Sequence, residues 1–218
     1  MSGEMFDLLQ RTGASGTEKQ IALQCAPLLT GIKMSSLLNI REEQKKEVFR
    51  LFDRTPVSGR ILYESAGRSL LFLYRKERLL AYLERGDVRR LMDSFGYGGL
   101  KLEKMLRLLS IRYQEHMSGL GQFPHEIGLL LGYPPGDVSG FIENNGQNFL
   151  YSGYWKVYGD LHGALRVFAQ YDHARGPWPG EDVRSGSWWP RCFAGPGWTP
   201  ENQIRELDLK SRAAACCR

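Results

Sequence analysis

The sequence lacks an apolar run long enough to cross a membrane. Its main apolar stretch, LLFLY at residues 70–74, is far shorter than the roughly 20 residues that a membrane-spanning helix needs. The N-terminal segment, MSGEMFDLLQRTG, has no basic region followed by an apolar one, which is the pattern of a secretory signal. We therefore expect a cytoplasmic protein that makes no use of a membrane.

Cysteine is also scarce, and its placement argues against a disulfide-stabilised protein. The four cysteines are Cys25, Cys192, Cys216 and Cys217, and none of them forms a C-x-x-C motif. Neighbours such as Cys216 and Cys217 form a disulfide only with strain, so the sequence contains no disulfide framework. A reducing cytoplasm is the expected compartment.

Charge and histidine spacing exclude two further kinds of site. The net charge of +5 is too small to indicate a nucleic-acid-binding protein without a concentrated basic patch. His125 and Glu126 are not followed by the second histidine of an H-E-x-x-H motif, and the other histidines have no metal-like spacing to them. We expect no metal site, and the sequence indicates no particular cofactor.

The composition that is present is that of a globular protein, and it changes near residue 174. Hydrophobic residues make up 42% of the chain and charged residues 24%, which are ordinary values for a folded domain. The residues after 173 are rich in proline, glycine and tryptophan, without a sustained period. We predict one globular domain at 1–173 and an irregular extension at 174–218, either disordered or docked through its tryptophans.

The periodicity within 1–173 predicts an α+β fold with a small, mostly antiparallel sheet covered by helices. A strand is expected at 35–40 and a hairpin at 60–75, with Ala66-Gly67 near its turn. Residues 70–74 are apolar at both odd and even positions, so both faces of this strand are apolar. The strand should therefore be central in the sheet and covered on both faces. Further elements are expected in this order: helices at 76–84, 87–95 and 99–117, a strand at 153–160 and a helix at 161–172.

The stretch FPHEIGLLLGYPPGDVSGFIENNG, residues 123–146, has the spacing of a helix-turn-helix. Gly128, Gly132 and Val138 occupy the positions at which that pattern requires a small residue, a turn glycine and an apolar residue, respectively. The second helix contains no lysine or arginine, although phosphate contacts need cations and base reading needs polar side chains at the exposed front of the helix. We predict a tight glycine-mediated helix pair at 123–145 and argue against DNA as its partner.

The same stretch also contains candidate catalytic residues. If Pro124 begins a helix, His125 and Glu126 fall in its first turn, where a histidine tends to stay neutral and can act as a base. If Pro27 begins another helix, Cys25 lies just before its N-terminus, a position that favours a reactive thiolate. The alternative is that His125 and Glu126 only cap a helix and that Cys25 is a structural residue of the core.

A candidate ligand-binding face lies in GYWKVYGD, residues 153–160. In a strand, Tyr154, Lys156 and Tyr158 would share one face, and a lysine between two tyrosines suits an anionic or planar ligand. An exposed face with a solvated lysine is an equally good interpretation. Arg75, at the end of the buried strand, would either pair with a carboxylate or bind a substrate anion.

The blocks CAPLLTGIK, FLYR, FPHEIGLLLGYPPGDVSGFI and GYWKVYGD together resemble an uncharacterised bacterial family, domain of unknown function 3793. The resemblance covers roughly residues 15–173 and implies no activity. It selects a set of positions rich in glycine and aromatic residues, as in a fold signature. Its polar members, which packing alone explains less well, include Cys25, Lys33, Arg75, His125, Glu126 and Lys156.

Three hypotheses follow for function. The first is a small-molecule-binding protein or thiol-dependent enzyme, with a pocket around Cys25, His125, Glu126 and Lys156. In its catalytic form Cys25 is the nucleophile, His125 the base and Glu126 the residue that orients it. The second is a helix-turn-helix-like regulator or adaptor that binds DNA or protein. The third is a structural or interaction protein whose motifs only specify the fold.

Overall fold

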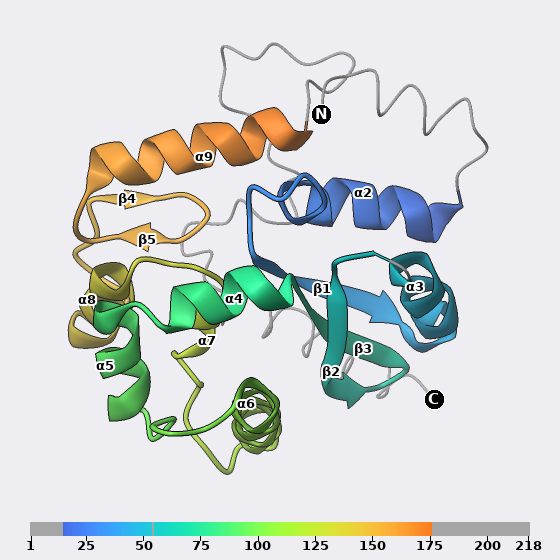
Figure 1. Ribbon diagram of the computed structural model, residues 1–218. Coiled ribbons are helices and arrows are strands. Elements are labelled where there is room, and N and C mark those ends of the chain that lie inside the picture. The colour runs from blue at the N-terminus through green and yellow to red at the C-terminus, as the bar shows by residue number, and fades with distance from the viewer. Residues whose placement is uncertain (1–14, 54, 176–218) are drawn as a thin grey trace, which may run out of the picture.

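A computed structural model describes residues 15–53 and 55–175 (Figure 1). The helices are Gly16–Leu29 (α2), Lys45–Phe52 (α3), Lys76–Leu83 (α4), Gly86–Ser94 (α5), Leu102–Met117 (α6), Ile127–Leu130 (α7), Pro135–Glu143 (α8) and Leu161–Arg175 (α9), with a 3-10 turn at Glu42–Gln44 (η1). The strands are Ser35–Arg41 (β1), Ser58–Ser65 (β2), Arg68–Tyr74 (β3), Tyr151–Ser152 (β4) and Lys156–Val157 (β5).

The main sheet is antiparallel, in the order β1-β3-β2. The predicted hairpin is confirmed, because β2 and β3 are joined by Ala66 and Gly67, which have φ of 48° and 72°. Two consecutive residues with positive φ twist a two-residue turn in the sense that the strands require. The predicted central position of 70–74 is also confirmed, since β3 pairs on both sides and residues 70–73 are buried.

Two hydrophobic clusters cover the two faces of the sheet. Alternate residues of β3 enter different clusters: Leu71 and Leu73 point to one face, Leu70 and Phe72 to the other, as the pleat requires. The α2 cluster lies between the sheet and helices α2 and α3, and contains Ile21, Cys25, Leu28, Leu38, Ile40, Val48, Phe52, Val57, Leu71 and Leu73. The larger α6 cluster, on the other face, includes residues of α4, α5, α6, α7, α8, β5 and α9. The fold is therefore α+β, with helices on both faces of a small antiparallel sheet.

The glycine-mediated helix pair is confirmed as α7 and α8. A Cβ atom on Gly128 would lie 3.1 Å from Val138 Cγ2 and 3.2 Å from Tyr133 Cδ2, so a larger residue here would require these neighbouring side chains to shift. The turn glycine, Gly132, has φ of 84°, which a residue with a side chain adopts at a cost. The first helix is shorter than the pattern predicted, a single turn that starts at Ile127 and leaves His125 before it.

Two further predictions about local structure are wrong. No helix begins at Pro27, because α2 continues through it to Leu29; a proline this close to a helix end removes only one hydrogen bond near the end of the ladder. The strand expected at 153–160 is reduced to two residues, Lys156–Val157. The N–H groups of Tyr158 and Gly159 donate to the carboxylate of Asp137 instead of to a neighbouring strand.

Other expectations concern parts of the chain that are not described. Cys192, Cys216 and Cys217 lie outside the described residues, as does the predicted extension from residue 176 onward.

The helix expected at 161–172 is α9, which runs to residue 175. Among residues 15–53 and 55–175, no helix is long and apolar enough to cross a membrane.

Candidate functional site

Cys25 lies inside α2 and is fully buried in the α2 cluster. The predicted position before a helix N-terminus, which was the physical reason for expecting a reactive thiolate, is therefore wrong. His125 stands between Phe123 and Ile127, which both pack in the α6 cluster on the other face of the sheet. The structure does not bring Cys25 and His125 together.

Glu126 is buried, with 3% of its surface exposed, and it forms an ion pair with Arg112. Its Oε1 accepts hydrogen bonds from Arg112 Nη1 at 2.7 Å and from the hydroxyl of Tyr97 at 2.9 Å. Burial and the adjacent Glu126 carboxylate raise the pKa of Tyr97 above its ordinary value. The same Arg112 nitrogen donates to the carbonyl of Phe95, so this group ties α6 to the segments that precede α6 and α7.

Arg75 donates to backbone carbonyls rather than to a carboxylate. Its Nε and Nη2 contact the carbonyl oxygens of Leu28 at 2.9 Å and Leu29 at 2.8 Å. These are among the last carbonyls of α2, which have no partner within the helix and carry the negative end of its dipole. Arg75 was expected either to pair with a carboxylate or to bind a ligand anion. The observed contacts with backbone carbonyls are of neither kind.

Asp137 has a structural role that the sequence did not indicate. It is buried in the first turn of α8 and accepts three hydrogen bonds, from Trp155 Nε1 at 2.7 Å, Tyr158 N at 2.8 Å and Gly159 N at 2.9 Å. A buried carboxylate is stable when donors surround it in this way. Asp137 therefore sets the conformation of residues 155–159. The only hint in the sequence was an acidic residue in the first turn of a glycine-rich helix.

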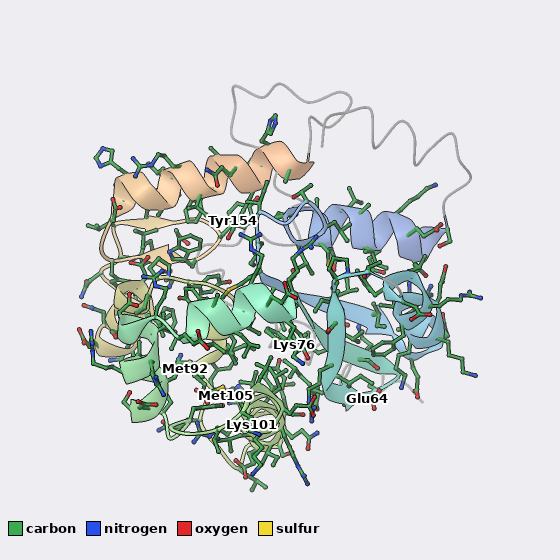
Figure 2. All side chains as sticks on the ribbon, viewed as in Figure 1. Glu64, Lys76, Met92, Lys101, Met105 and Tyr154 are labelled. Atoms are coloured by element: carbon green, nitrogen blue, oxygen red, sulfur yellow. The ribbon has the colours of Figure 1, made fainter. Side chains whose placement is uncertain are left out.

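The strand on which Tyr154, Lys156 and Tyr158 were expected to share a face is reduced to Lys156–Val157. The hydroxyl of Tyr154 donates to Asp172 Oδ1 at 2.6 Å, beneath α9, where Figure 2 labels it. The ring of Tyr158 packs over Gly140. Its hydroxyl oxygen is buried and has no hydrogen-bond partner within the described part of the chain. The side chain of Lys156 is also buried, and its Nζ lies over the ring of Phe141, the residue next to Gly140.

Lys156 and His125 do meet at a shared neighbour, the ring of Phe141. The centroid of that ring lies 5.4 Å from the His125 ring and 5.7 Å from Lys156 Nζ. Lys156 Nζ also donates to the carbonyl of Gly146 at 2.6 Å and lies 4.7 Å from the ring centre of Phe149, which is 37% exposed. We call His125, Phe141, Phe149 and Lys156 the Phe141 cluster.

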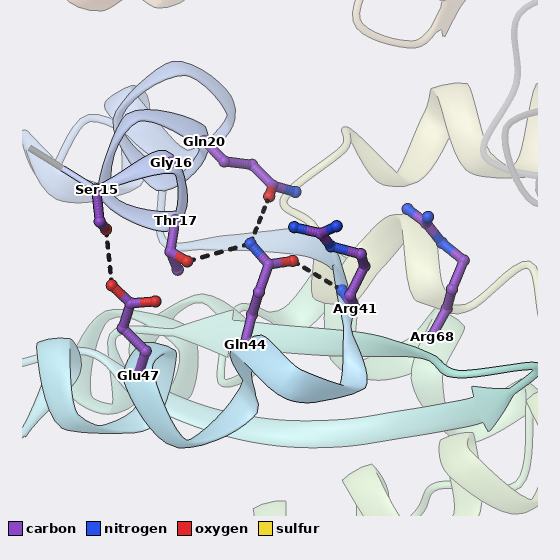
Figure 3. A pocket seen from close by; sticks show the side chains of 8 residues that line it. All are labelled: Ser15, Gly16, Thr17, Gln20, Arg41, Gln44, Glu47 and Arg68. Carbon is purple, nitrogen blue, oxygen red and sulfur yellow. Dashed lines mark hydrogen bonds between the residues drawn. The ribbon is translucent and has the colours of Figure 1, made fainter.

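A polar hollow of about 450 Å³ lies at another place, between the start of α2 and the end of β1 (Figure 3). Its volume is in the range of small-molecule sites. The residues that line it come from α2, β1, η1, α3 and β3, and none was among the predicted site residues. They are Ser15, Gly16, Thr17, Gln20, Arg41, Gln44, Glu47 and Arg68.

Two arginines stand side by side at one end of the hollow. Arg41 and Arg68 are direct partners across the β1–β3 ladder, an arrangement of like charges that destabilises a sheet. The Nε of Arg41 forms an exposed ion pair with Glu43 at 3.1 Å. The Nε of Arg68 donates a hydrogen bond to Asn39 Oδ1 at 3.0 Å. Within the described residues, no hydrogen bond engages the terminal nitrogens of either guanidinium.

The floor of the hollow is a chain of hydrogen-bonded amides. Gln44 is buried; its Nε2 donates to Thr17 Oγ1 at 3.1 Å and to Gln20 Oε1 at 3.3 Å, and its Oε1 accepts from Arg41 N at 2.9 Å. Glu47 lies at the other end from the arginines (Figure 3), and its Oε1 accepts from Ser15 Oγ at 2.7 Å. The side-chain amides of Gln20 and Gln44 are therefore bonded to each other along the floor.

Sequence reasoning missed this hollow for an identifiable reason. Arg41 directly follows a predicted strand and Arg68 follows a predicted turn, so both could be placed near strand ends. Which strands pair, and in which register, could not be read from the sequence. Among residues 15–53 and 55–175, no group of three or more histidine, cysteine, aspartate or glutamate side chains could hold a metal ion.

Comparison with known proteins identifies a family. A family model described as "Protein of unknown function (DUF3793)" matches residues 21–178, more than half of the chain. No curated protein and no solved structure matches the chain.

Proposed function

The chain belongs to the DUF3793 family of proteins of unknown function, and we propose that it is a small-molecule-binding protein whose ligand has an anionic group bound between Arg41 and Arg68. The observation that carries the proposal is the pairing of these two arginines across the ladder, at the rim of the polar hollow. No reaction is part of the proposal.

The electrostatics of the arginine pair favour an anion. Two guanidinium groups held opposite each other repel, and a carboxylate or phosphate between them converts that repulsion into two charge-assisted contacts. The planar fork of an arginine matches the oxygens of such a group. The ion pair between Arg41 and Glu43 competes only weakly with a ligand anion for Arg41. The two side chains are 64% and 71% exposed, and exposed ion pairs contribute little binding energy.

Thiol chemistry is left out of the proposal for two reasons. Cys25 is fully buried among apolar side chains, and burial in such surroundings disfavours the thiolate that a nucleophile requires. In addition, Glu126, the residue expected to orient a histidine base, accepts its hydrogen bonds from Arg112 and Tyr97.

The test is a binding titration with simple anions. Phosphate and acetate are titrated by calorimetry at constant ionic strength against the full chain and against Arg41→Gln, Arg68→Gln and Arg89→Gln. Arg89 is an exposed arginine of α5 and serves as the matched control for loss of one charge. We expect either hollow variant to weaken binding about tenfold, which corresponds to roughly 1.4 kcal/mol, and the control to leave it unchanged. Equal binding by all four proteins would refute the proposal.

A second candidate site is the Phe141 cluster. There an ammonium group and a histidine flank one aromatic ring, a combination that suits a planar anionic ligand. Benzoate is the probe, with Lys156→Met as the test variant and Arg68→Gln as the control. Benzoate binding that is lost in the first variant and kept in the second would favour this site over the hollow.

A further inference from the structure

We infer that the ligand of the hollow is a zwitterion, a short peptide, with its carboxylate between Arg41 and Arg68 and its ammonium at Glu47. This inference rests on the proposed function and adds to it the chemical class of the ligand. The observation that leads to it is the separation of charge within the hollow: cationic side chains at one end and a carboxylate at the other (Figure 3).

Glu47 is available to a cationic group. Among the described residues it forms no ion pair, whereas Glu42, Glu43 and Glu64 each have a lysine or arginine partner. Hydrogen bonds from the hydroxyls of Thr17 and Ser15 lower the pKa of Glu47, so its carboxylate is charged at neutral pH. A charged carboxylate that is held in place by hydroxyl donors can accept a further hydrogen bond from an ammonium group.

The middle of the hollow discriminates little between ligands of different charge. Between the two ends lie Thr17, Gln20 and Gln44, all of them neutral. Gln20 Nε2 donates to the carbonyl of Asn39 at 2.7 Å, and Gln44 is bonded on both sides of its amide. Because these groups already satisfy one another, the ends of the hollow decide which ligand is accepted. The floor is preorganised, which reduces the entropy cost of binding.

A simple anion satisfies only one end of this arrangement. Inorganic phosphate would reach the arginines, yet it would gain nothing from Glu47 and would be repelled by it. A ligand with a carboxylate and an ammonium group is attracted at both ends. The predicted signature is therefore a preference for the zwitterion over either half of it.

The experiment uses blocked short peptides on the full chain. A set of dipeptides and tripeptides is first screened by thermal shift, and the one with the largest shift is compared by calorimetry with its N-acetyl derivative and its methyl ester. We expect each blocked form to bind about tenfold more weakly than the zwitterion. In Glu47→Gln the N-acetyl form should bind as well as the zwitterion, whereas in Arg68→Gln the methyl ester should do so.

The outcomes separate the inference from the proposed function. If the N-acetyl form binds wild type as tightly as the zwitterion, or if phosphate binds and no peptide does, the zwitterion inference is overturned and the anion site stands. If neither a simple anion nor a peptide binds, both are overturned. Glu47→Asp keeps the charge and serves as the second variant should Glu47→Gln fail to fold; it should still discriminate against the N-acetyl form.

Discussion

The guanidinium of Arg75 and the carbonyl of Leu28 are joined by a hydrogen bond of 2.9 Å between Nε and O. A second bond of 2.8 Å runs from Nη2 to the carbonyl of Leu29. Arg75 directly follows the central strand, and the two leucines end α2. One side chain thus fixes the end of α2 against the end of β3, and it neutralises a helix terminus that includes a proline, Pro27.

The first prediction concerns this cap. Arg75→Lys should lower the free energy of unfolding by about 1.5 kcal/mol, because an ammonium group cannot bond both carbonyls in the fork geometry of a guanidinium. Urea denaturation measures the change. The control, Arg89→Lys on the exposed face of α5, should stay within about 0.5 kcal/mol of wild type. Equal effects in the two variants would contradict the capping assignment.

The second prediction compares two glycines of α8. A Cβ on Gly140 would lie 2.7 Å from Cβ and Cγ of Tyr158, whereas one on Gly136 would meet nothing within 4 Å. Gly140→Ala should therefore destabilise the protein by about 1–3 kcal/mol through overpacking. Gly136→Ala should stabilise it by about 0.5–1 kcal/mol through the greater helix propensity of alanine. Thermal denaturation of both variants checks the opposite signs.

The third prediction concerns alkaline pH. Burial raises the pKa of Tyr171 to about 12, compared with about 10 for an unfolded tyrosine. Between these values the unfolded chain has lost the proton that the folded chain keeps. The free energy of unfolding therefore falls as pH rises through this window, by up to about 1.4 kcal/mol per pH unit for this group. Urea denaturation from pH 9 to 11.5 should show a smaller slope in Tyr171→Phe.

Measurement at pH 7 provides the control for the alkaline experiment, because it gives the cost of the missing hydroxyl by itself. Tyr82 and Tyr133 also have pKa values raised by burial, so part of the slope should remain in the variant. A variant with the full wild-type slope would show that Tyr171 is not protected from ionisation in the folded protein.

The fourth prediction concerns the thiol. In a variant with Cys192, Cys216 and Cys217 replaced by serine, Cys25 should react with a thiol reagent only at the rate at which the structure opens, since its side chain is fully buried. Labelling in native buffer and in urea gives the two rates. Fast labelling of the folded chain would restore the sequence-based hypothesis of a nucleophilic Cys25.

Predictions from the sequence succeeded where a local rule was sufficient. Alternation and turn residues located β1 and the β2–β3 hairpin, and the apolar run at 70–74 identified the central strand. The spacing of Gly128 and Gly132 identified the packed helix pair. Each of these depends on residues that are near one another in the chain, where backbone geometry limits the possibilities.

Predictions failed where a distant partner decided the outcome. Asp137 draws the N–H groups of Tyr158 and Gly159 out of a strand, and Arg75 bonds to a helix end that lies more than forty residues earlier, with a separation of 47 to Leu28. Glu126 was expected to orient a catalytic base, yet its hydrogen bonds connect segments of the fold.

The sequence by itself determined the class of fold, the central strand and the glycine-mediated helix pair, because periodicity and backbone freedom are local properties. Only the tertiary structure decided which charged groups face one another. The pairing of Arg41 with Arg68 depends on the register between β1 and β3, and the position of Glu47 opposite them depends on how α2 and α3 pack at the end of the sheet. Register and packing are set by the whole core, so the hollow could be found only in three dimensions.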